Sequence, residues 1–359
     1  MTEQDRPTVQ HSSRPDAPAP APSAGSVPPP AQRMMELVVG SWAARAVHAA
    51  VVLGIPERLA ASGSVDSARL AVDTGADPAA LRRLMDYLVA LEICAGDAEG
   101  YRLTPYGDVL RAGTPGSVSD YVLLAGQEFY AAWGELLHTV HTGEPAFDKV
   151  YGQNLYAYTA TNPEAGQRFD AAMNTGRLLF DPISRLDRLA DARRVVDIGG
   201  GNGELLAELL LAHPRLGGVL HELAAPAAAA PAYLEAKGVG DRCEVVVGDM
   251  FEQVPGGADV YVLSRVLVNW DDDKAARLLA NCARAMPVGA TLLVVERPQS
   301  QGAPTPVAAA VDLLMMLVTS GGRSRTTAEL RTLLADAGLT PDAPVELPQG
   351  FQLLAAHRR

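Results

Sequence analysis

The segment from Val195 to Leu206 constrains the fold more than any other part of the chain. It reads VVDIGGGNGELL, so an apolar run leads into a glycine-rich turn and helix-forming residues follow directly. Glycine lets the backbone approach a ligand closely where any Cβ would collide. We therefore expect a buried strand, a tight ligand-binding turn and a helix in immediate succession.

Short apolar runs alternate with helical segments after Arg194. The expected strands and helices occupy residues 195–198, 205–211, 218–220, 243–247, 259–263, 275–285 and 291–295. This alternation predicts an α/β fold with a Rossmann-like, mostly parallel sheet and helices on both faces. Ligands of such sheets bind beyond the carboxyl ends of the strands.

The glycine turn favours a cofactor with a cationic centre. Dinucleotide-binding turns follow GxGxxG, whereas Gly199, Gly201 and Gly203 follow GxGxG. The acidic Asp197 before the turn would also repel a pyrophosphate.

Two further acids follow predicted strands. Glu222 lies 23 residues after Gly199, near the spacing at which a carboxylate grips ribose hydroxyls. Asp249 precedes Met250 and Phe251. A carboxylate beside soft apolar groups suits an adenine, which it can bind through the amino group.

Together these motifs resemble class I S-adenosylmethionine-dependent small-molecule O-methyltransferases that have an N-terminal winged-helix dimerisation domain. The resemblance spans roughly residues 33–357 and is nearest to the branch that acts on anthracycline-type aromatic polyketides. The motifs that carry it are residues 199–203, Glu222, 248–251, 263–272, 294–296 and 321–326.

The resemblance implies S-adenosylmethionine as cofactor and a set of residues that hold it. Arg168, from the connecting helices, is the implied partner of the cofactor carboxylate. The other implied cofactor residues are Asp197, Gly199, Gly201, Glu222, Asp249, Met250, Phe251, Ser264, Arg265 and Trp270.

The catalytic motif departs from the family at two positions. Most members read His-Asp-Trp where this chain has Val268-Asn269-Trp270, and Ser324 replaces a second acid, while Glu296 is retained. Valine cannot accept a proton, so general-base catalysis, typically worth about 10²–10⁴-fold, is lost at this position. We expect catalysis by positioning, with the catalytic residues Asn269, Tyr156 and Glu296 and the substrate-binding residues Met173, Asn269, Met315 and Met316.

Two functions remain open at this point. The first is methyl transfer to a hydroxyl of an aromatic or polyketide-type natural product, in which proximity and orientation replace the base. The second is a tailoring reaction without methyl transfer (hydroxylation, decarboxylation or cyclisation), in which the sulfonium charge stabilises developing negative charge.

The remainder of the chain suggests three more segments. Residues 1–32 contain 8 of the 26 prolines and predict a disordered tail. Residues 33–115 predict a winged-helix domain, helical apart from a hairpin around residues 94–103, and its apolar stripe, together with the resemblance, predicts a homodimer. Residues 116–190 predict an aromatic-rich helical connector that lines the substrate pocket, and residues 191–359 form the cofactor-binding domain.

Composition excludes other classes of protein. The formal net charge of −12 disfavours nucleic acid as a partner, so a ligand-responsive transcription factor is disfavoured too. The chain lacks a long uninterrupted apolar run and a signal-peptide core, so we expect a cytoplasmic enzyme without membrane contact. We expect no metal: His138 and His141 lack a third ligand, and Asp271–Asp273 suit a helix N-terminus.

Overall fold

The computed structural model describes residues 29–173, 177–299 and 302–359. The chain divides into two compact units, Met1–Ala43 and Ala44–Arg359. Most of the predicted tail lies outside the described residues. Helix α1 (Pro30–Val52) begins inside the predicted tail boundary, so residues 30–32 are helical rather than part of a tail.

The apolar stripe of α1 is divided between exposed and packed positions. Leu37, Val38 and Trp42 are 53–70% exposed, whereas Val51 is buried. Among the described helices, α1 alone is long and apolar enough to span a membrane. A single helix of this kind near the N-terminus is weak evidence for a membrane span. The exposed part of the stripe is available to a partner.

Three helices and a hairpin follow α1, as predicted for a winged helix. They are α2 (Ile55–Ser62), α3 (Ser67–Thr74), α4 (Pro78–Ala90) and the antiparallel pair β1 (Cys94–Asp97) and β2 (Gly100–Leu103), followed by α5 (Pro105–Asp108). The side chains of Asp66 and Asp77 accept backbone N–H groups of the first turns of α3 and α4, which explains where these helices begin.

The connector is a set of short helices, also as predicted. They are α6 (Ser119–Leu124), the π-helix η1 (Ala125–Phe129), α7 (Tyr130–Gly134), α8 (Leu136–Thr142), α9 (Ala146–Tyr151), α10 (Leu155–Thr161), α11 (Pro163–Met173), α12 (Arg177–Ser184) and α13 (Asp187–Ala190). The aromatic residues form part of a packed core here: the Phe147 ring lies 4.5 Å from that of Tyr151 and 5.5 Å from that of Tyr158.

The C-terminal half is built on one sheet with the order β5-β4-β3-β6-β7-β10-β8, and β9 pairs with β10. The five parallel strands are β3 (Arg194–Ile198), β4 (Gly217–Glu222), β5 (Cys243–Val247), β6 (Val260–Ser264) and β7 (Thr291–Glu296). They confirm the predicted strands. The antiparallel strands β8 (Leu339–Pro341), β9 (Val345–Glu346) and β10 (Gln352–Arg358) were not predicted.

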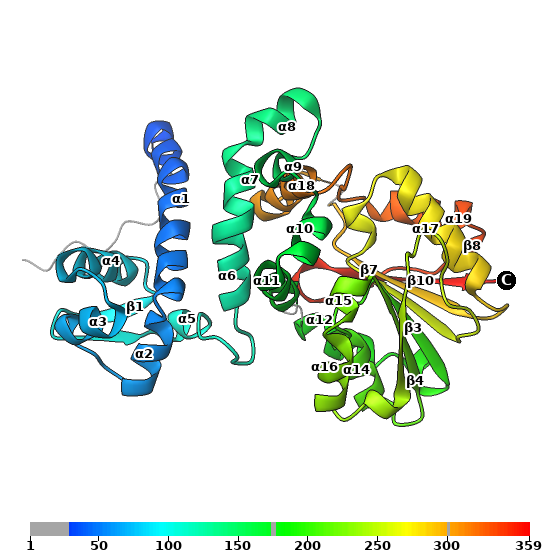
Figure 1. The fold of residues 1–359 in the computed structure, drawn as a ribbon. Coiled ribbons are helices and arrows are strands. Elements are labelled where there is room, and N and C mark those ends of the chain that lie inside the picture. The colour runs from blue at the N-terminus through cyan, green and yellow to red at the C-terminus, as the bar shows by residue number, and fades with distance from the viewer. Residues whose placement is uncertain (1–28, 174–176, 300–301) are drawn as a thin grey trace, which may run out of the picture. The chain divides into compact units, whose positions relative to one another are not determined.

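Helices cover both faces of the sheet (Figure 1). One apolar core joins the sheet to α14 (Glu204–Ala212) and α16 (Ala230–Ala236); the other joins it to α17 (Asp272–Ala285) and α19 (Thr327–Asp336). Helix α18 (Pro306–Val318) packs with the connector instead, through Leu314, Leu317 and Val318. Because β3–β7 run parallel, their carboxyl ends lie at one edge of the sheet, where the chain places Asp197, Glu222, Ser264 and Glu296.

Candidate active site

The glycine turn has the backbone conformation that the sequence predicts. Gly199 and Gly201 follow β3 with φ values of 68° and 61°, in the left-handed region that glycine adopts without strain. Helix α14 starts directly after the turn, at Glu204. The turn thus presents a helix N-terminus to a ligand, together with a backbone that the ligand can approach closely.

Asp197 lies beneath this turn and is 1% exposed. A Cβ on Gly200 would collide with this buried carboxylate and with Leu220 unless their side chains shifted. Burial, with Glu222 nearby, raises the pKa of Asp197 to about 7. Its Oδ2 is buried and has no hydrogen-bond partner among the described residues, which leaves an acceptor for a cationic group.

Glu222, at the end of β4, is fixed against the turn by its own hydrogen bonds. Its Oε2 accepts the N–H of Gly201 at 2.9 Å and its Oε1 accepts the N–H of Leu223 at 2.7 Å. Burial raises the pKa of this carboxyl, and the two backbone donors oppose the shift. The structure therefore brings Glu222 to the glycine turn, and its predicted ribose-binding role stays a prediction.

Asp249, Met250 and Phe251 form the next side of the site, after β5. Asp249 Oδ1 accepts the backbone N–H of Phe251 at 2.8 Å. The Phe251 ring meets the Trp270 ring edge-on, with centroids 4.8 Å apart. The indole Nε1 of Trp270 is buried without a partner among the described residues. These residues come together as an aromatic and acidic wall.

Tyr156 of α10 lies against this wall. Its ring stacks on Trp270 with centroids 5.7 Å apart and an interplanar angle of 20°. Burial, with the charge of Glu222 as a lesser cause, raises the pKa of its hydroxyl. Tyr156 is thus placed beside two predicted cofactor residues, and its predicted catalytic role stays a prediction.

Ser264 ends β6 at the same edge, and Arg265 follows it. Arg265 has a φ of 59°, unusual for a side chain other than glycine, and its Nη1 donates to the carbonyl of Met173 at 2.8 Å. Burial lowers the pKa of its guanidinium, although nearby carboxylates, Glu296 first among them, oppose the shift. Ser264 Oγ is buried without a partner among the described residues.

The short helix η4 (Leu267–Asn269) carries the position where the family has its base, and we call residues 267–270 the acceptor turn. Glu296, 4% exposed, accepts the N–H of Leu267 at 2.8 Å and that of Val268 at 3.3 Å through Oε1. Burial raises the pKa of Glu296 to about 7, against the opposing effect of these two amides.

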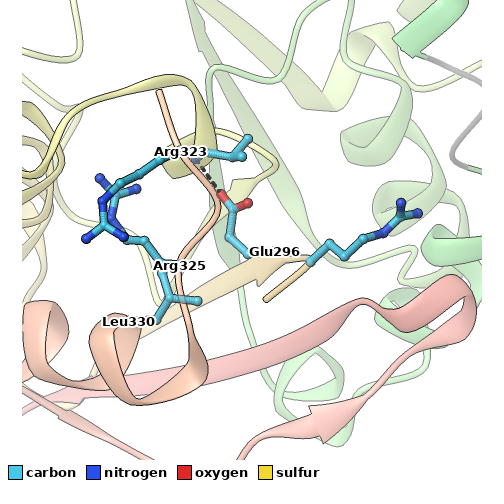
Figure 2. A pocket seen from close by; sticks show the side chains of 6 residues that line it. Glu296, Arg323, Arg325 and Leu330 are labelled. Atoms are coloured by element: carbon cyan, nitrogen blue, oxygen red, sulfur yellow. Dashed lines mark hydrogen bonds between the residues drawn. The ribbon is translucent and has the colours of Figure 1, made fainter. Parts of the chain in front are cut away.

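Arg325 holds the carbonyls of the same turn and was not predicted as a site residue. It is 3% exposed and donates to the carbonyls of Leu267 at 2.7 Å and Trp270 at 2.8 Å, as well as to Asp272 at 2.9 Å. Figure 2 shows Glu296 on one side of a narrow recess and Arg323 and Arg325 on the other. Two opposite charges therefore fix the turn, one through its amides and one through its carbonyls.

The glycine pair of residues 321–322 brings the loop of Arg325 close to the acceptor turn. A Cβ on Gly322 would approach the Val268 carbonyl oxygen to 2.8 Å. A narrow recess lies beside this contact and is lined by Val268, Glu296, Arg297, Arg323, Arg325 and Leu330. Ser324, which replaces the family's acid, donates its N–H to Asp312 at 2.7 Å.

The predicted substrate residues lie on three elements. Met173 ends α11 and Met315 lies on α18, and both pack against one apolar cluster; Met316 follows on α18, half-buried. Asn269 donates Nδ2–H to the carbonyl of Arg265 at 3.1 Å. The structure thus joins Met173 and Met315, and the substrate-binding role of all four residues stays a prediction.

Arg168 is engaged elsewhere. Its Nε and Nη2 donate to Glu128 Oε1 at 3.2 and 2.8 Å, and the Glu128 side chain is 2% exposed. Glu128 lies on the π-helix, and no sequence signal pointed to it. The predicted contact between Arg168 and a cofactor carboxylate stays a prediction.

The structure places the acidic run and the two histidines that we did not assign to catalysis. Asp271 caps α17 by accepting the Lys274 N–H at 2.8 Å, which confirms its assignment to a helix N-terminus. His138 and His141 lie on α8, and within the described ranges no group of three His, Cys, Asp or Glu side chains is arranged to hold a metal ion.

Comparison with protein families decides what this arrangement is. Residues 133–340 match an O-methyltransferase domain, and residues 35–113 match an O-methyltransferase dimerisation domain. The chain belongs to the O-methyltransferase family. This O-methyltransferase therefore depends on S-adenosylmethionine, which confirms the resemblance, the fold class and the predicted cofactor.

Three relatives illustrate the family. The O-methyltransferase is 39% identical to 3-amino-4-hydroxybenzoate 4-O-methyltransferase of Streptomyces cremeus, over 91% of this chain and 90% of that one. It is 36% identical to phenazine-1-carboxylate N-methyltransferase of Pseudomonas aeruginosa, over 91% and 97%. It is 32% identical to an O-methyltransferase from neocarzinostatin biosynthesis solved with S-adenosylmethionine and 2-hydroxy-5-methyl naphthoic acid, with a TM-score of 0.76 over 88% and 96%. The relatives support the methyl-transfer hypothesis and not its alternative.

The described residues fit this cofactor. Asp197 offers an unpartnered carboxylate oxygen, and Ser264 and Trp270 offer unpartnered polar groups at the same edge. A cationic cofactor with an adenine ring can use these groups, since each lacks a partner of its own.

Proposed function

We propose that this O-methyltransferase methylates a hydroxyl of an aromatic or polyketide-type natural product by positioning the acceptor, without a histidine base. The observation that carries the proposal is Val268 in an acceptor turn whose amides bind Glu296 and whose carbonyls bind Arg325. Such a turn can hold an acceptor rigidly although it offers no imidazole.

The cofactor would lie along the glycine turn. Gly199, Gly201 and Asp197 would face its methionine part, and Ser264 and Arg265 would border the same part. Glu222 would bind ribose, and Asp249, Met250, Phe251 and Trp270 would enclose adenine. When bound, S-adenosylmethionine supplies an electrophilic methyl group on a positively charged sulfur.

The acceptor would lie between the acceptor turn and the helical connector. Asn269 would orient the acceptor, and Met173, Met315 and Met316 would supply adaptable apolar walls. Glu296 would act by holding the turn, because its Oε1 already accepts two backbone amides. Alignment of the acceptor oxygen with the methyl group can supply a large part of the rate enhancement.

The names of the relatives suit an aromatic acceptor. The first two act on an aminohydroxybenzoate and on a phenazine carboxylate, and the third was solved with a naphthoic acid. All three compounds have planar aromatic rings and carry a carboxylate. A small planar aromatic compound is therefore the acceptor class that we propose.

The proposal includes the predicted organisation of the enzyme. We propose a cytoplasmic homodimer formed by the winged-helix domain, whose first helix begins at Pro30, with further segment boundaries at residues 115 and 190 and no nucleic-acid or membrane partner. The exposed side chains of Leu37, Val38 and Trp42 support such an interface. Sedimentation as a monomer at micromolar concentration would count against it.

Incubation with S-adenosylmethionine and a panel of polycyclic phenols tests the reaction. We expect a methylated product and an equal amount of S-adenosylhomocysteine. Conversion of an acceptor without S-adenosylhomocysteine would refute methyl transfer and favour the non-methylating chemistry.

A further inference from the structure

We propose that Arg297 binds a carboxylate on the aromatic acceptor, so that the enzyme selects anionic acceptors over neutral ones of the same shape. The inference rests on the proposed function, because it assumes that a planar aromatic acceptor lies beside the acceptor turn. It follows from the position of Arg297, from the ring that its guanidinium covers and from a buried N–H group that has no partner.

Arg297 lies at the edge of the sheet where the site residues gather. It directly follows Glu296, the last residue of β7. It also lines the narrow recess to which Val268 of the acceptor turn contributes. A charge at this position can therefore reach a group on an acceptor that lies beside the turn.

The guanidinium of Arg297 is oriented by an aromatic ring. Its Cζ lies 4.5 Å from the centroid of the Phe351 ring. Phe351 is 9% exposed and precedes β10, in which Gln352 pairs with Glu296 of β7. Contact with an aromatic face holds a guanidinium without using its N–H groups as hydrogen-bond donors. Phe351 thus fixes the position of the charge and leaves the donors to a ligand.

One donor of Arg297 is buried without a partner. Its Nε has no hydrogen-bond partner among the described residues. Arg323 and Arg325, which line the same recess, differ because both form ion pairs with Asp272. A buried N–H group is costly to leave unpaired, so folded proteins usually supply it with an acceptor. An anionic ligand can supply the acceptor that Arg297 lacks.

The connector contributes a hydroxyl close to Arg297. Tyr121 lies on α6, at the start of the helical connector that we propose as a wall of the acceptor pocket. Burial raises the pKa of the Tyr121 hydroxyl, and the positive charge of Arg297 opposes this shift. A neutral hydroxyl beside a guanidinium provides two kinds of donor, which together suit a carboxylate.

The order of the strands favours the acceptor over the cofactor as the source of this carboxylate. The glycine turn follows β3 and Arg297 follows β7, and β6 lies between these strands. Neighbouring strands are about 4.8 Å apart, which places the end of β7 about 10 Å from the end of β3. The acceptor turn follows β6, the neighbour of β7, so an acceptor beside it lies nearer to Arg297 than the glycine turn does.

An ion pair at one end of the acceptor would restrict how its ring can turn. A guanidinium can donate two parallel N–H groups to one carboxylate, which sets both distance and orientation. Such an anchor suits a site without a histidine base, because alignment of the acceptor hydroxyl with the methyl group then supplies more of the rate. Arg297 itself forms and breaks no covalent bond.

The test compares hydroxynaphthoates with the corresponding naphthamides, which have the same shape and no charge. 3-Hydroxy-2-naphthoate and 6-hydroxy-2-naphthoate place the carboxylate next to the hydroxyl and far from it. Each compound is titrated calorimetrically into enzyme loaded with S-adenosylhomocysteine, and kcat and KM are measured separately with S-adenosylmethionine. We expect the native enzyme to bind at least one naphthoate about 10–100-fold more tightly than its amide.

Variants of Arg297 assign the preference to this side chain. Arg297→Met removes the charge and keeps an apolar chain over Phe351, so it should weaken binding of the naphthoate about 10–100-fold and leave that of the amide within about twofold. Arg297→Lys keeps the charge without the planar fork and should lower the preference by at least about threefold, which provides the comparison if Arg297→Met does not fold. Arg277→Met, at an exposed position of α17, is the control for the loss of one positive charge and should leave the preference within about twofold.

The outcomes separate the inference from the proposed function. Equal binding of naphthoate and amide by the native enzyme, or an undiminished preference in Arg297→Met, would overturn the inference and leave the proposed function standing. Weaker binding of S-adenosylhomocysteine in Arg297→Met, with naphthoate binding unchanged, would also overturn it, because the carboxylate at Arg297 would then belong to the cofactor. Absence of methylated product from every acceptor, with the preference present in calorimetry, would refute the proposed function and leave carboxylate binding by Arg297 standing.

Discussion

The guanidinium of Arg325 donates to the backbone carbonyl of Trp270 at 2.8 Å, although 55 residues separate them in sequence. The same guanidinium donates to the carbonyl of Leu267, and Glu296 accepts the backbone N–H of Leu267. Two oppositely charged side chains, Glu296 and Arg325, therefore anchor the backbone of the acceptor turn.

Replacement of Arg325 should loosen the acceptor turn. Arg325→Met leaves the Trp270 carbonyl without its donor and removes one of the two donors to the Leu267 carbonyl, which also accepts the N–H of Trp270. This loss should cost about 1–3 kcal/mol in the free energy of unfolding. Urea denaturation measures this cost, and steady-state kinetics should show a higher KM for the acceptor. Arg323→Met is the matched control, because Arg323 forms exposed ion pairs with Asp272 and Glu329, worth about 0–1 kcal/mol. Equal effects of both variants would contradict the assigned role of Arg325.

Glu296 should make stability depend on pH. Its pKa of about 7 lies above the ordinary carboxyl value of 4.5, so the folded state binds the proton more tightly than the unfolded chain. This contribution is complete below about pH 4.5 and is lost as the pH rises through about 7.

Glu296→Gln keeps an oxygen for the amides of Leu267 and Val268 and removes the titration. The variant should therefore gain stability relative to the native enzyme, by up to about 3 kcal/mol, between pH 5 and pH 8 in urea denaturation. Glu244→Gln, at an exposed position, should show no such trend. Loss of all methyl transfer in the well-folded Glu296→Gln variant would instead support the predicted catalytic role.

Glu222 should be needed for cofactor affinity. Glu222→Gln places an amide group where a carboxylate oxygen accepts the N–H of Gly201 or Leu223, so one backbone donor loses its acceptor. We expect S-adenosylhomocysteine to bind about 10–100-fold more weakly by calorimetry, equivalent to about 1.4–2.8 kcal/mol. Native affinity in this variant would remove Glu222 from the cofactor site. Glu244→Gln, on the neighbouring strand β5, is the control.

Tyr156 should act through its ring. The stacking on Trp270 and the raised pKa of the hydroxyl favour a neutral side chain that covers the cofactor wall. Tyr156→Phe should retain S-adenosylhomocysteine affinity within about twofold, whereas Tyr156→Ala should weaken it about tenfold, equivalent to about 1.4 kcal/mol. Quenching of tryptophan fluorescence reports the binding. A large loss of turnover in Tyr156→Phe with intact binding would support the predicted catalytic hydroxyl.

Local patterns in the sequence predicted much of this fold. The parallel strands, the glycine turn, the helix cap of Asp271 and the hairpin of residues 94–103 each depend on a few consecutive residues. The antiparallel strands β8 and β9 were missed because they are short and lie at the sheet edge, where burial gives little periodic signal.

The sequence alone determined the family, the cofactor and the loss of the histidine base, because these depend on residue identity at a few motif positions. The tertiary structure decided the environment of those residues. Glu296 accepts hydrogen bonds from amides of the acceptor turn, 28 residues away in the case of Val268, and Arg325 donates to carbonyls of the same turn. Arg168 donates to the buried Glu128. Such contacts join distant segments through burial and charge, which short-range spacing does not record.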